Sequence, residues 1–216
     1  MNGNPTPPTA VDHVRMAAKS AGKRASIAGQ KGKLRAEILL MDNKINARKM
    51  KFGVELYDFL VPQAENDPTF IIDSEVLTNI RGMFVTAFKD NKALLQKKAK
   101  KQMDLTSVVE QRAVAFPVPA VSIGEKMVNA GRAASFTGRE TAIKTKISLL
   151  EKEMKINKQN FGVQAYALLV NLEDTTKWLP SDRDVRFFYD QCRRDIQKME
   201  EEKKEKQAGI QLLGLK

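Results

Sequence analysis

The chain has 216 residues, of which 42% are hydrophobic and 29% charged, a balance typical of a globular protein rather than a disordered or membrane-embedded one. Lysine and arginine total 37 against 26 acidic residues, which gives a net charge of +11 at pH 7. A single cysteine, Cys192, and a single histidine, His13, exclude a disulfide framework and a zinc site built from Cys and His. We therefore expect neither a metal site nor a cofactor.

The first ten residues, 1–10, are rich in Pro, Thr and Asn and are expected to form a disordered tail. They lack the hydrophobic core of a secretory signal, and no stretch of the chain reaches the roughly 18 apolar residues of a membrane-spanning helix. Together with the lone cysteine, these features favour an intracellular and specifically a cytoplasmic location.

Residues 11–36 are strongly basic, with Asp12 as their single acid. Such a segment resembles an organelle transit peptide, or it can place a basic face against anionic lipid. The transit-peptide interpretation is the less favoured one because the segment has an internal counterpart, described next. The candidate residues for contact with lipid or another anion are Lys19, Lys23, Arg24, Lys31 and Lys33.

Much of the chain is duplicated at a constant offset of 109 residues, so that residues 21–60 align without gaps to residues 130–169. Identical pairs include Gly22/Gly131, Ser26/Ser135, Gly29/Gly138, Leu40/Leu149, Lys49/Lys158, Phe52/Phe161, Gly53/Gly162, Val54/Val163, Tyr57/Tyr166 and Leu60/Leu169. The expected organisation is a first helical-hairpin repeat over 11–108, a proline-containing linker over 109–124, a second repeat over 125–207 and an apolar tail over 208–216.

Each repeat begins with a long helix whose apolar residues follow a heptad spacing, expected over about residues 30–60 in the first copy. The seam residues are Leu34, Ile38, Met41, Ile45, Phe52 and Phe59 in that copy and Ile143, Ile147, Leu150, Met154, Phe161 and Leu168 in the second. Polar residues interrupt the seam at the same two places, namely Arg48 and Glu55 in one copy and Asn157 and Gln164 in the other.

A second helix follows in each repeat. Pro62 and Pro68 are expected to end the first helix, and Pro180 to open the last one. The candidate N-caps of the two second helices are Asp73 or Ser74 and Ser181 or Asp182. Their seams comprise Val76, Ile80, Met83, Ala87 and Leu94, and Val185, Tyr189, Cys192, Ile196 and Met199. Both helices then become polar on all sides, over 97–102 and 199–207, where we expect them to project into solvent or fray.

Short connections between helices imply antiparallel neighbours. The predicted fold class is therefore all-α, with two tandem, coiled-coil-like antiparallel helical hairpins in a four-helix arrangement of pseudo-twofold symmetry.

The repeated Phe-Gly-Val block lies in the middle of a predicted helix, where glycine costs about 1 kcal/mol relative to alanine. Close approach of another helix is the favoured explanation, and a peptide-docking groove lined by Phe52 and Tyr57 is the functional alternative. The candidate interaction residues are Phe52, Gly53, Tyr57, Phe161, Gly162 and Tyr166.

Ser26 and Ser135 follow arginine or lysine by two or three residues, which makes them candidate phosphorylation sites for basophilic kinases. The alternative is that each serine is an ordinary N-cap close to a helix start.

No catalytic constellation is visible, and the glycines at 22–29 and 131–138 lack the spacing of a phosphate-binding loop. We therefore expect a non-enzymatic scaffold or adaptor that binds a protein partner, a second copy of the chain included, through its helical seams. Binding to an anionic membrane surface is the alternative. Nucleic acid is the least favoured partner because no aromatic residues are interleaved with the basic ones.

Overall fold

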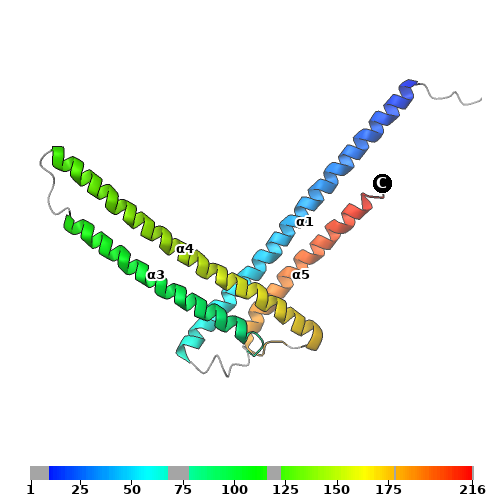
Figure 1. The fold of residues 1–216 in the computed structure, drawn as a ribbon. Helices are drawn as coiled ribbons and strands as arrows, with labels where there is room; N and C mark the ends of the chain where they lie inside the picture. The colour runs from blue at the N-terminus through cyan, green and yellow to red at the C-terminus, as the bar shows by residue number, and fades with distance from the viewer. Residues whose placement is uncertain (1–9, 68–77, 116–122, 178, 216) are drawn as a thin grey trace, which may run out of the picture. The chain divides into compact units, whose positions relative to one another are not determined.

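The computed structural model describes residues 10–67, 78–115, 123–177 and 179–215. These residues form four long helices and no strand: α1 (Ala10–Asn66), α3 (Arg81–Ala115), α4 (Ile123–Thr176) and α5 (Arg183–Leu212) (Figure 1). The predicted all-α class with a four-helix arrangement is confirmed. The expected tail at 1–9, Pro68 and the candidate caps Asp73 and Ser74 lie outside the described residues.

The chain divides into two compact units that do not follow the order of the repeats. Unit 1 comprises Met1–Arg48 and Arg193–Lys216, and unit 2 comprises Lys49–Cys192. Helices α1 and α5 each contribute to both units, so each unit combines segments from both copies of the repeat.

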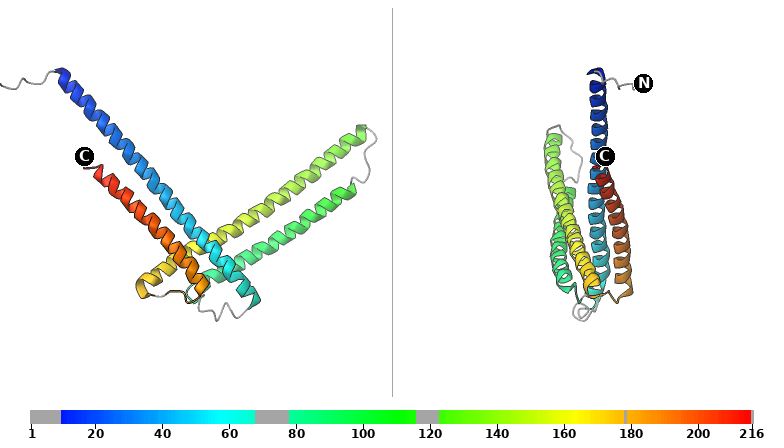
Figure 2. Two further views of the ribbon diagram at one scale, coloured as in Figure 1. Left: turned by 180° about the vertical axis from the view of Figure 1, so that it is seen from behind. Right: turned by 90° about the vertical axis from the view of Figure 1, so that its right-hand side faces the viewer.

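In unit 2, aromatic contacts join the two helices of each repeat, but the helix that runs alongside α3 is α4 of the other repeat rather than α1 of its own. The rings of Tyr57 and Phe84 join α1 to α3 with their centroids 5.9 Å apart, and those of Tyr166 and Tyr189 join α4 to α5 at 6.1 Å. Helix α3 also runs antiparallel alongside α4 over most of its length (Figure 2). This pairing explains why Phe84 is fully buried, a residue that the heptad pattern missed in favour of the half-exposed Met83.

In unit 1, the end of α5 runs alongside α1, and a series of ion pairs joins the two helices. Arg48 Nε lies 2.7 Å from the Asp195 carboxylate, Lys203 Nζ lies 2.6 Å from Asp42, and Lys206 Nζ lies 2.5 Å from Glu37. The prediction that residues 199–207 project into solvent or fray is therefore wrong. The ion pairs act together with apolar contacts, since Met41, Ile45 and Ile196 of this unit are buried and Leu34 lies against Gly209.

The same correction applies to the polar end of α3. Residues 97–102 are helical and face α4, with Lys98 Nζ 2.7 Å from the Glu151 carboxylate. Helix α3 continues to Ala115, and α4 begins at Ile123. The linker expected over 109–124 is thus partly helical at both ends, and the tail expected from residue 208 is helical as far as Leu212.

Pro62 does not end the first helix, which runs from Ala10 to Asn66. The side chain of Pro62 points to solvent, whereas Leu60 and Ala64 on either side of it are 0% and 6% exposed. Burial of these two residues offsets the single backbone hydrogen bond that proline removes. Pro180 precedes α5 and is buried, and the helix is capped by Asp182, whose Oδ1 accepts hydrogen bonds from the backbone N–H groups of Asp184 and Val185. The prediction of Asp182 as an N-cap is confirmed.

The centre of unit 2 is a crossing of α1 and α4 at Gly53 and Gly162. A Cβ atom added to Gly53 would lie 2.2 Å from the Cα of Gly162, and one added to Gly162 would lie 2.0 Å from the Cα of Gly53. The two backbones are therefore in direct contact, which confirms the predicted close approach of another helix. Because the contacting residues are equivalent in the two repeats, a local two-fold axis passes between them.

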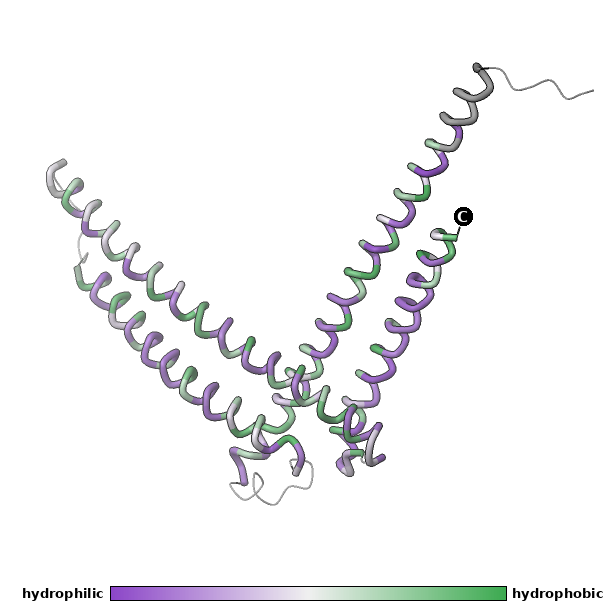
Figure 3. The backbone as a smooth tube through the Cα atoms, turned by 45° about the vertical axis from the view of Figure 1, so that its right-hand side comes forward, coloured by the Kyte–Doolittle hydropathy of each residue, from purple (hydrophilic) through white to green (hydrophobic). Residues whose placement is uncertain are grey.

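Apolar residues recur at intervals along each helix rather than in continuous runs (Figure 3). The buried ones near the crossing include Phe52, Phe161, Val185 and Tyr189 of the predicted seams, together with Leu56, Leu60, Ala165 and Leu169, which the heptad seams did not include. The thiol of Cys192 is also fully buried, as its place in the seam predicts.

The glycine contact leads to a first prediction, which compares alanine substitutions at matched helical glycines. Gly53→Ala or Gly162→Ala forces two backbones apart and should lower the free energy of unfolding by at least about 3 kcal/mol. Gly29→Ala and Gly138→Ala are the controls, because a Cβ there meets nothing within 4 Å. Each of these two control changes should raise the free energy of unfolding by about 1 kcal/mol. Urea unfolding followed by circular dichroism measures all four, and shifts of the same sign in both pairs would contradict the contact.

Candidate functional site

The six candidate interaction residues form a buried cluster around the glycine crossing. The ring centroids of Phe52 and Tyr166 are 6.0 Å apart, and those of Tyr57 and Phe161 are 6.2 Å apart, both in edge-to-face geometry. All four side chains are at most 5% exposed. Each contact has its counterpart at the offset of 109 residues, so the cluster obeys the same two-fold symmetry as the crossing.

Two lysines extend the symmetry to charged groups. Lys49 Nζ lies 5.5 Å from the ring centroid of Tyr166, and Lys158 Nζ lies 5.1 Å from that of Tyr57. Lys158 also forms an ion pair of 2.6 Å with Asp58, which has no acidic equivalent because the corresponding residue is Ala167. The two halves of the cluster are therefore alike in packing but different in charge.

The polar residues of the predicted seams find partners inside the chain. In unit 1, Arg48 pairs with Asp195, and the Arg48 side chain is only 11% exposed. In unit 2, Asn157 Nδ2 donates a hydrogen bond of 3.3 Å to Oδ1 of Asn91, a buried residue of α3. These two seam positions thus do not present unsatisfied groups to another protein.

Asn91 is the residue of this region that the sequence analysis overlooked. It stands four residues after Ala87 and three before Leu94, which are both buried, so it occupies a seam position of its own helix. The sequence did contain a signal for Asn91, namely a polar residue at a helix position where an apolar one is expected. Its buried Nδ2 has no hydrogen-bond partner.

Burial raises the pKa of Tyr57, because the tyrosinate would be charged in a largely apolar environment. The nearby Asn91 amide lowers the pKa of Tyr57, against the effect of burial, although its Nδ2 does not reach the geometry of a full hydrogen bond. Tyr57, unlike Phe52, also lines a cavity between α1, α3 and α4. The groove hypothesis is therefore retained for Tyr57 alone.

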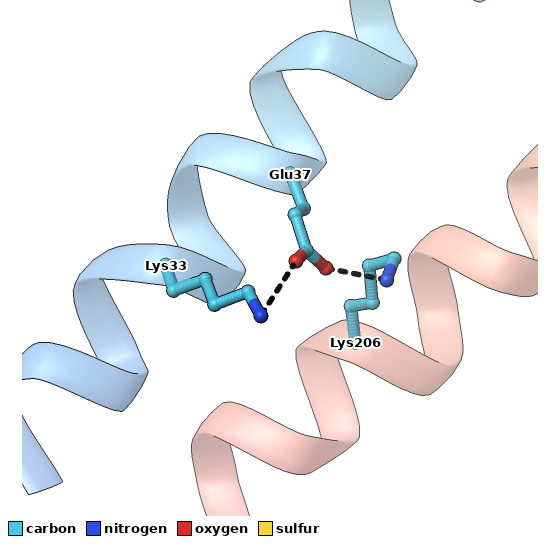
Figure 4. A network of polar contacts seen from close by, with 3 residues as sticks. All are labelled: Lys33, Glu37 and Lys206. Carbon is cyan, nitrogen blue, oxygen red and sulfur yellow. Dashed lines mark hydrogen bonds and ion pairs between the residues drawn. The ribbon is translucent and has the colours of Figure 1, made fainter.

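The candidate anion-binding residues lie along the first half of α1. Lys19, Lys23, Arg24 and Lys33 are exposed, while Lys31 is half-buried near Gly214, at the end of α5. Lys33 and Lys206 both face the Glu37 carboxylate, which lies between the two helices (Figure 4). The hydrogen bond from Lys206 lowers the pKa of Glu37. Lys33 therefore already has an acidic partner within the chain, Glu37 at 4.0 Å.

Ser26 and Ser135 lie in the interior of α1 and α4, which begin at Ala10 and Ile123. Neither serine caps a helix, so the N-cap interpretation is wrong. Both side chains are exposed, and their phosphorylation stays a prediction. A phosphate there would not gain from the helix dipole, because that effect is confined to the first turn.

Within the described ranges, no group of three or more His, Cys, Asp or Glu residues is arranged to hold a metal ion. None of the helices in those ranges is long and apolar enough to cross a membrane. Comparison with protein-family models, with curated proteins and with solved structures finds no match to this chain. Its function therefore has to be argued from its own residues.

The raised pKa of Tyr57 predicts a loss of stability at alkaline pH. Above about pH 10, the ordinary value for tyrosine, the unfolded chain releases this proton while the folded chain retains it, so rising pH favours unfolding. Tyr57→Phe removes this contribution, and the free energy of unfolding should then fall less between pH 8 and pH 11 than in the unmodified protein. Equal losses of the free energy of unfolding in the variant and in the unmodified protein would show that the fold does not raise the pKa of Tyr57.

Proposed function

We propose that this protein is a non-enzymatic scaffold or adaptor that binds amphipathic helices of partner proteins through two equivalent surface sites. The observation that carries the proposal is the exposure of Leu40 and Leu149, which is 59% for both residues. They are identical in the two repeats. The phenylalanines of the two Phe-Gly-Val blocks are also identical, but they are buried. Retention of an exposed leucine at the same position of both copies favours a role in binding.

Each leucine has apolar neighbours on its own helix. Leu39 beside Leu40 is 65% exposed, and Ile156, two helical turns after Leu149 on the same face, is 41% exposed. Leu149 and Leu150 also border a cavity of about 330 Å³ between α3 and α4. These features create a short apolar stripe of the kind that receives the apolar face of a helix.

The charges around the stripe on α4 indicate the chemistry of the partner. Lys97, Lys101 and Lys146 line the same small cavity, with Glu153 as the only acid. An apolar stripe flanked by acidic residues would complement this surface. A second copy of the chain is a further partner that the test below covers.

Two equivalent sites on one chain allow two helices to be held at once, which is the property that defines a scaffold. Two of the polar seam positions that first suggested partner binding, Arg48 and Asn157, have partners within the chain, so the proposal rests on the outer leucines. The buried thiol of Cys192, which forms no disulfide, is compatible with a reducing compartment, and the proposal places the protein in the cytoplasm.

The test uses a synthetic amphipathic peptide with a leucine stripe flanked by glutamates, titrated into the full chain by calorimetry. The unmodified protein should bind two peptides, Leu40→Asp or Leu149→Asp should bind one, and the double variant none. Met103→Asp is the matched control, since Met103 is exposed to 73% but unrepeated. Sedimentation equilibrium of the same variants reports self-association. Unchanged stoichiometry in the double variant, or an equal loss in the control, would refute the proposal.

A second candidate function is binding to an anionic membrane, and one observation favours it. Over residues 21–30, α1 is almost entirely exposed and extends beyond the end of α5, which reaches only the neighbourhood of Lys31 (Figure 1). Lys23 and Arg24 stand on this unaccompanied stretch, Lys19 precedes it, and no acidic residue occurs between Asp12 and Glu37. A basic helix of this kind is attracted to anionic lipid headgroups.

For this candidate, the triple change Lys19→Gln, Lys23→Gln and Arg24→Gln should weaken binding to phosphatidylserine-containing vesicles on the order of a hundredfold, at about 1 kcal/mol for each charge. Changing Lys89, Lys100 and Lys152 to Gln removes the same charge from other exposed sites and should have little effect. Flotation at low and high salt measures both. Binding that survives high salt, or that both triple variants lose equally, would exclude a specific role for α1.

A further inference from the structure

The cavity lined by Tyr57 has the size and lining of a small-molecule site. It lies within unit 2 between α1, α3 and α4 and has a volume of about 420 Å³, within the usual range for ligand pockets of about 300–1,000 Å³. Its apolar wall consists of Val54, Val61, Phe88, Leu95 and Met154. Leu95 is 54% exposed, so the cavity opens to the surface on the side of α3.

One polar group in the lining is buried without a hydrogen-bond partner. Asn91 is 6% exposed, its Oδ1 accepts a hydrogen bond from Asn157, and its Nδ2 has no hydrogen bond. A buried amide N–H left unsatisfied costs free energy, and an acceptor atom of a ligand in the cavity would remove that cost.

The charged groups of the lining favour an anion. Lys158 is paired with Asp58 and Glu151 is paired with Lys98, so these two charges are offset within the chain. The remaining charged groups of the lining are Lys92, Lys155 and Glu65, with a net positive charge. An anionic head at the mouth of the cavity would have two ammonium groups available and the Asn91 amide as a further donor.

We propose that this cavity binds a small amphipathic carboxylate, such as a medium-chain fatty acid, with its carboxylate near Lys92, Lys155 and Asn91 and its alkyl chain against the apolar wall. The site is not a consequence of the repeat. At the offset of 109 residues, Phe88, Asn91 and Leu95 correspond to Gln197, Glu200 and Lys204, which are all polar. The described part of the second repeat therefore lacks an equivalent site, and the expected stoichiometry is one ligand per chain.

The experiment titrates decanoate, kept well below its micellar concentration, into the full chain by calorimetry. One molecule should bind, whereas acetate and decylammonium should not, because the first lacks the alkyl chain and the second repels the lysines. Lys92→Gln and Lys155→Gln should each weaken decanoate binding about tenfold, the range expected for a charge-assisted hydrogen bond. Lys152→Gln is the matched control for Lys155→Gln, because Lys152 is an exposed lysine of α4 that does not line the cavity. This variant should bind decanoate like the unmodified protein.

Two further variants test the position of the ligand inside the cavity. Asn91→Leu removes the amide and should weaken binding, and circular dichroism checks that the fold is kept, because the hydrogen bond from Asn157 is lost as well. Val61→Phe fills the apolar wall and should abolish binding. Equal binding of decanoate and decylammonium, equal losses in Lys155→Gln and Lys152→Gln, or retention of binding by Val61→Phe would each overturn the proposal. Displacement of decanoate by the leucine-stripe peptide would assign the cavity to a helical partner instead.

Discussion

The direct contact between Gly53 and Gly162 is the constraint on which unit 2 depends. With no Cβ on either residue, the backbones of α1 and α4 meet, and the rings of Phe52, Tyr57 and their repeat equivalents fill the space around the contact. Any side chain at the crossing would separate the helices and open the aromatic cluster to water. The free energy that glycine costs within a helix is offset by the burial of these aromatic side chains.

The two-fold symmetry at the crossing is not maintained in the surface chemistry. Lys49 and Lys158 lie over equivalent tyrosines, but only Lys158 has an acidic partner within the described residues. The α3 residues that line the cavity beside Tyr57, namely Phe88, Asn91 and Leu95, have polar equivalents in the second repeat. A duplicated framework thus carries two kinds of surface. We propose that the repeated leucines bind two partners and that the cavity beside Tyr57 binds one ligand. The proposal for the leucines rests on residues that are identical in the two repeats, and the proposal for the cavity rests on residues that differ between them.

Much of the fold could be predicted from the sequence because its determinants are local and periodic. The duplication, the heptad seams, the helical class and the close approach at the glycines all follow from the spacing of residue types, and Asp182 was recognisable as a cap. Other features could not be read from local pattern. Pro62 remains inside its helix because Leu60 and Ala64 are buried on either side of it, and that burial depends on distant segments.

The sequence by itself determined that this protein is helical, duplicated and basic, and that glycine must face another helix in both copies. Only the tertiary structure decided which partner each polar helix end would take. Residues 199–207 lie along α1 and residues 97–102 along α4, because charges far apart in the chain meet as ion pairs. It also decided that Leu40 and Leu149 remain exposed and that Asn91 borders a cavity. Periodicity identifies the apolar face of a helix, but how completely that face is covered depends on packing between residues distant in the sequence.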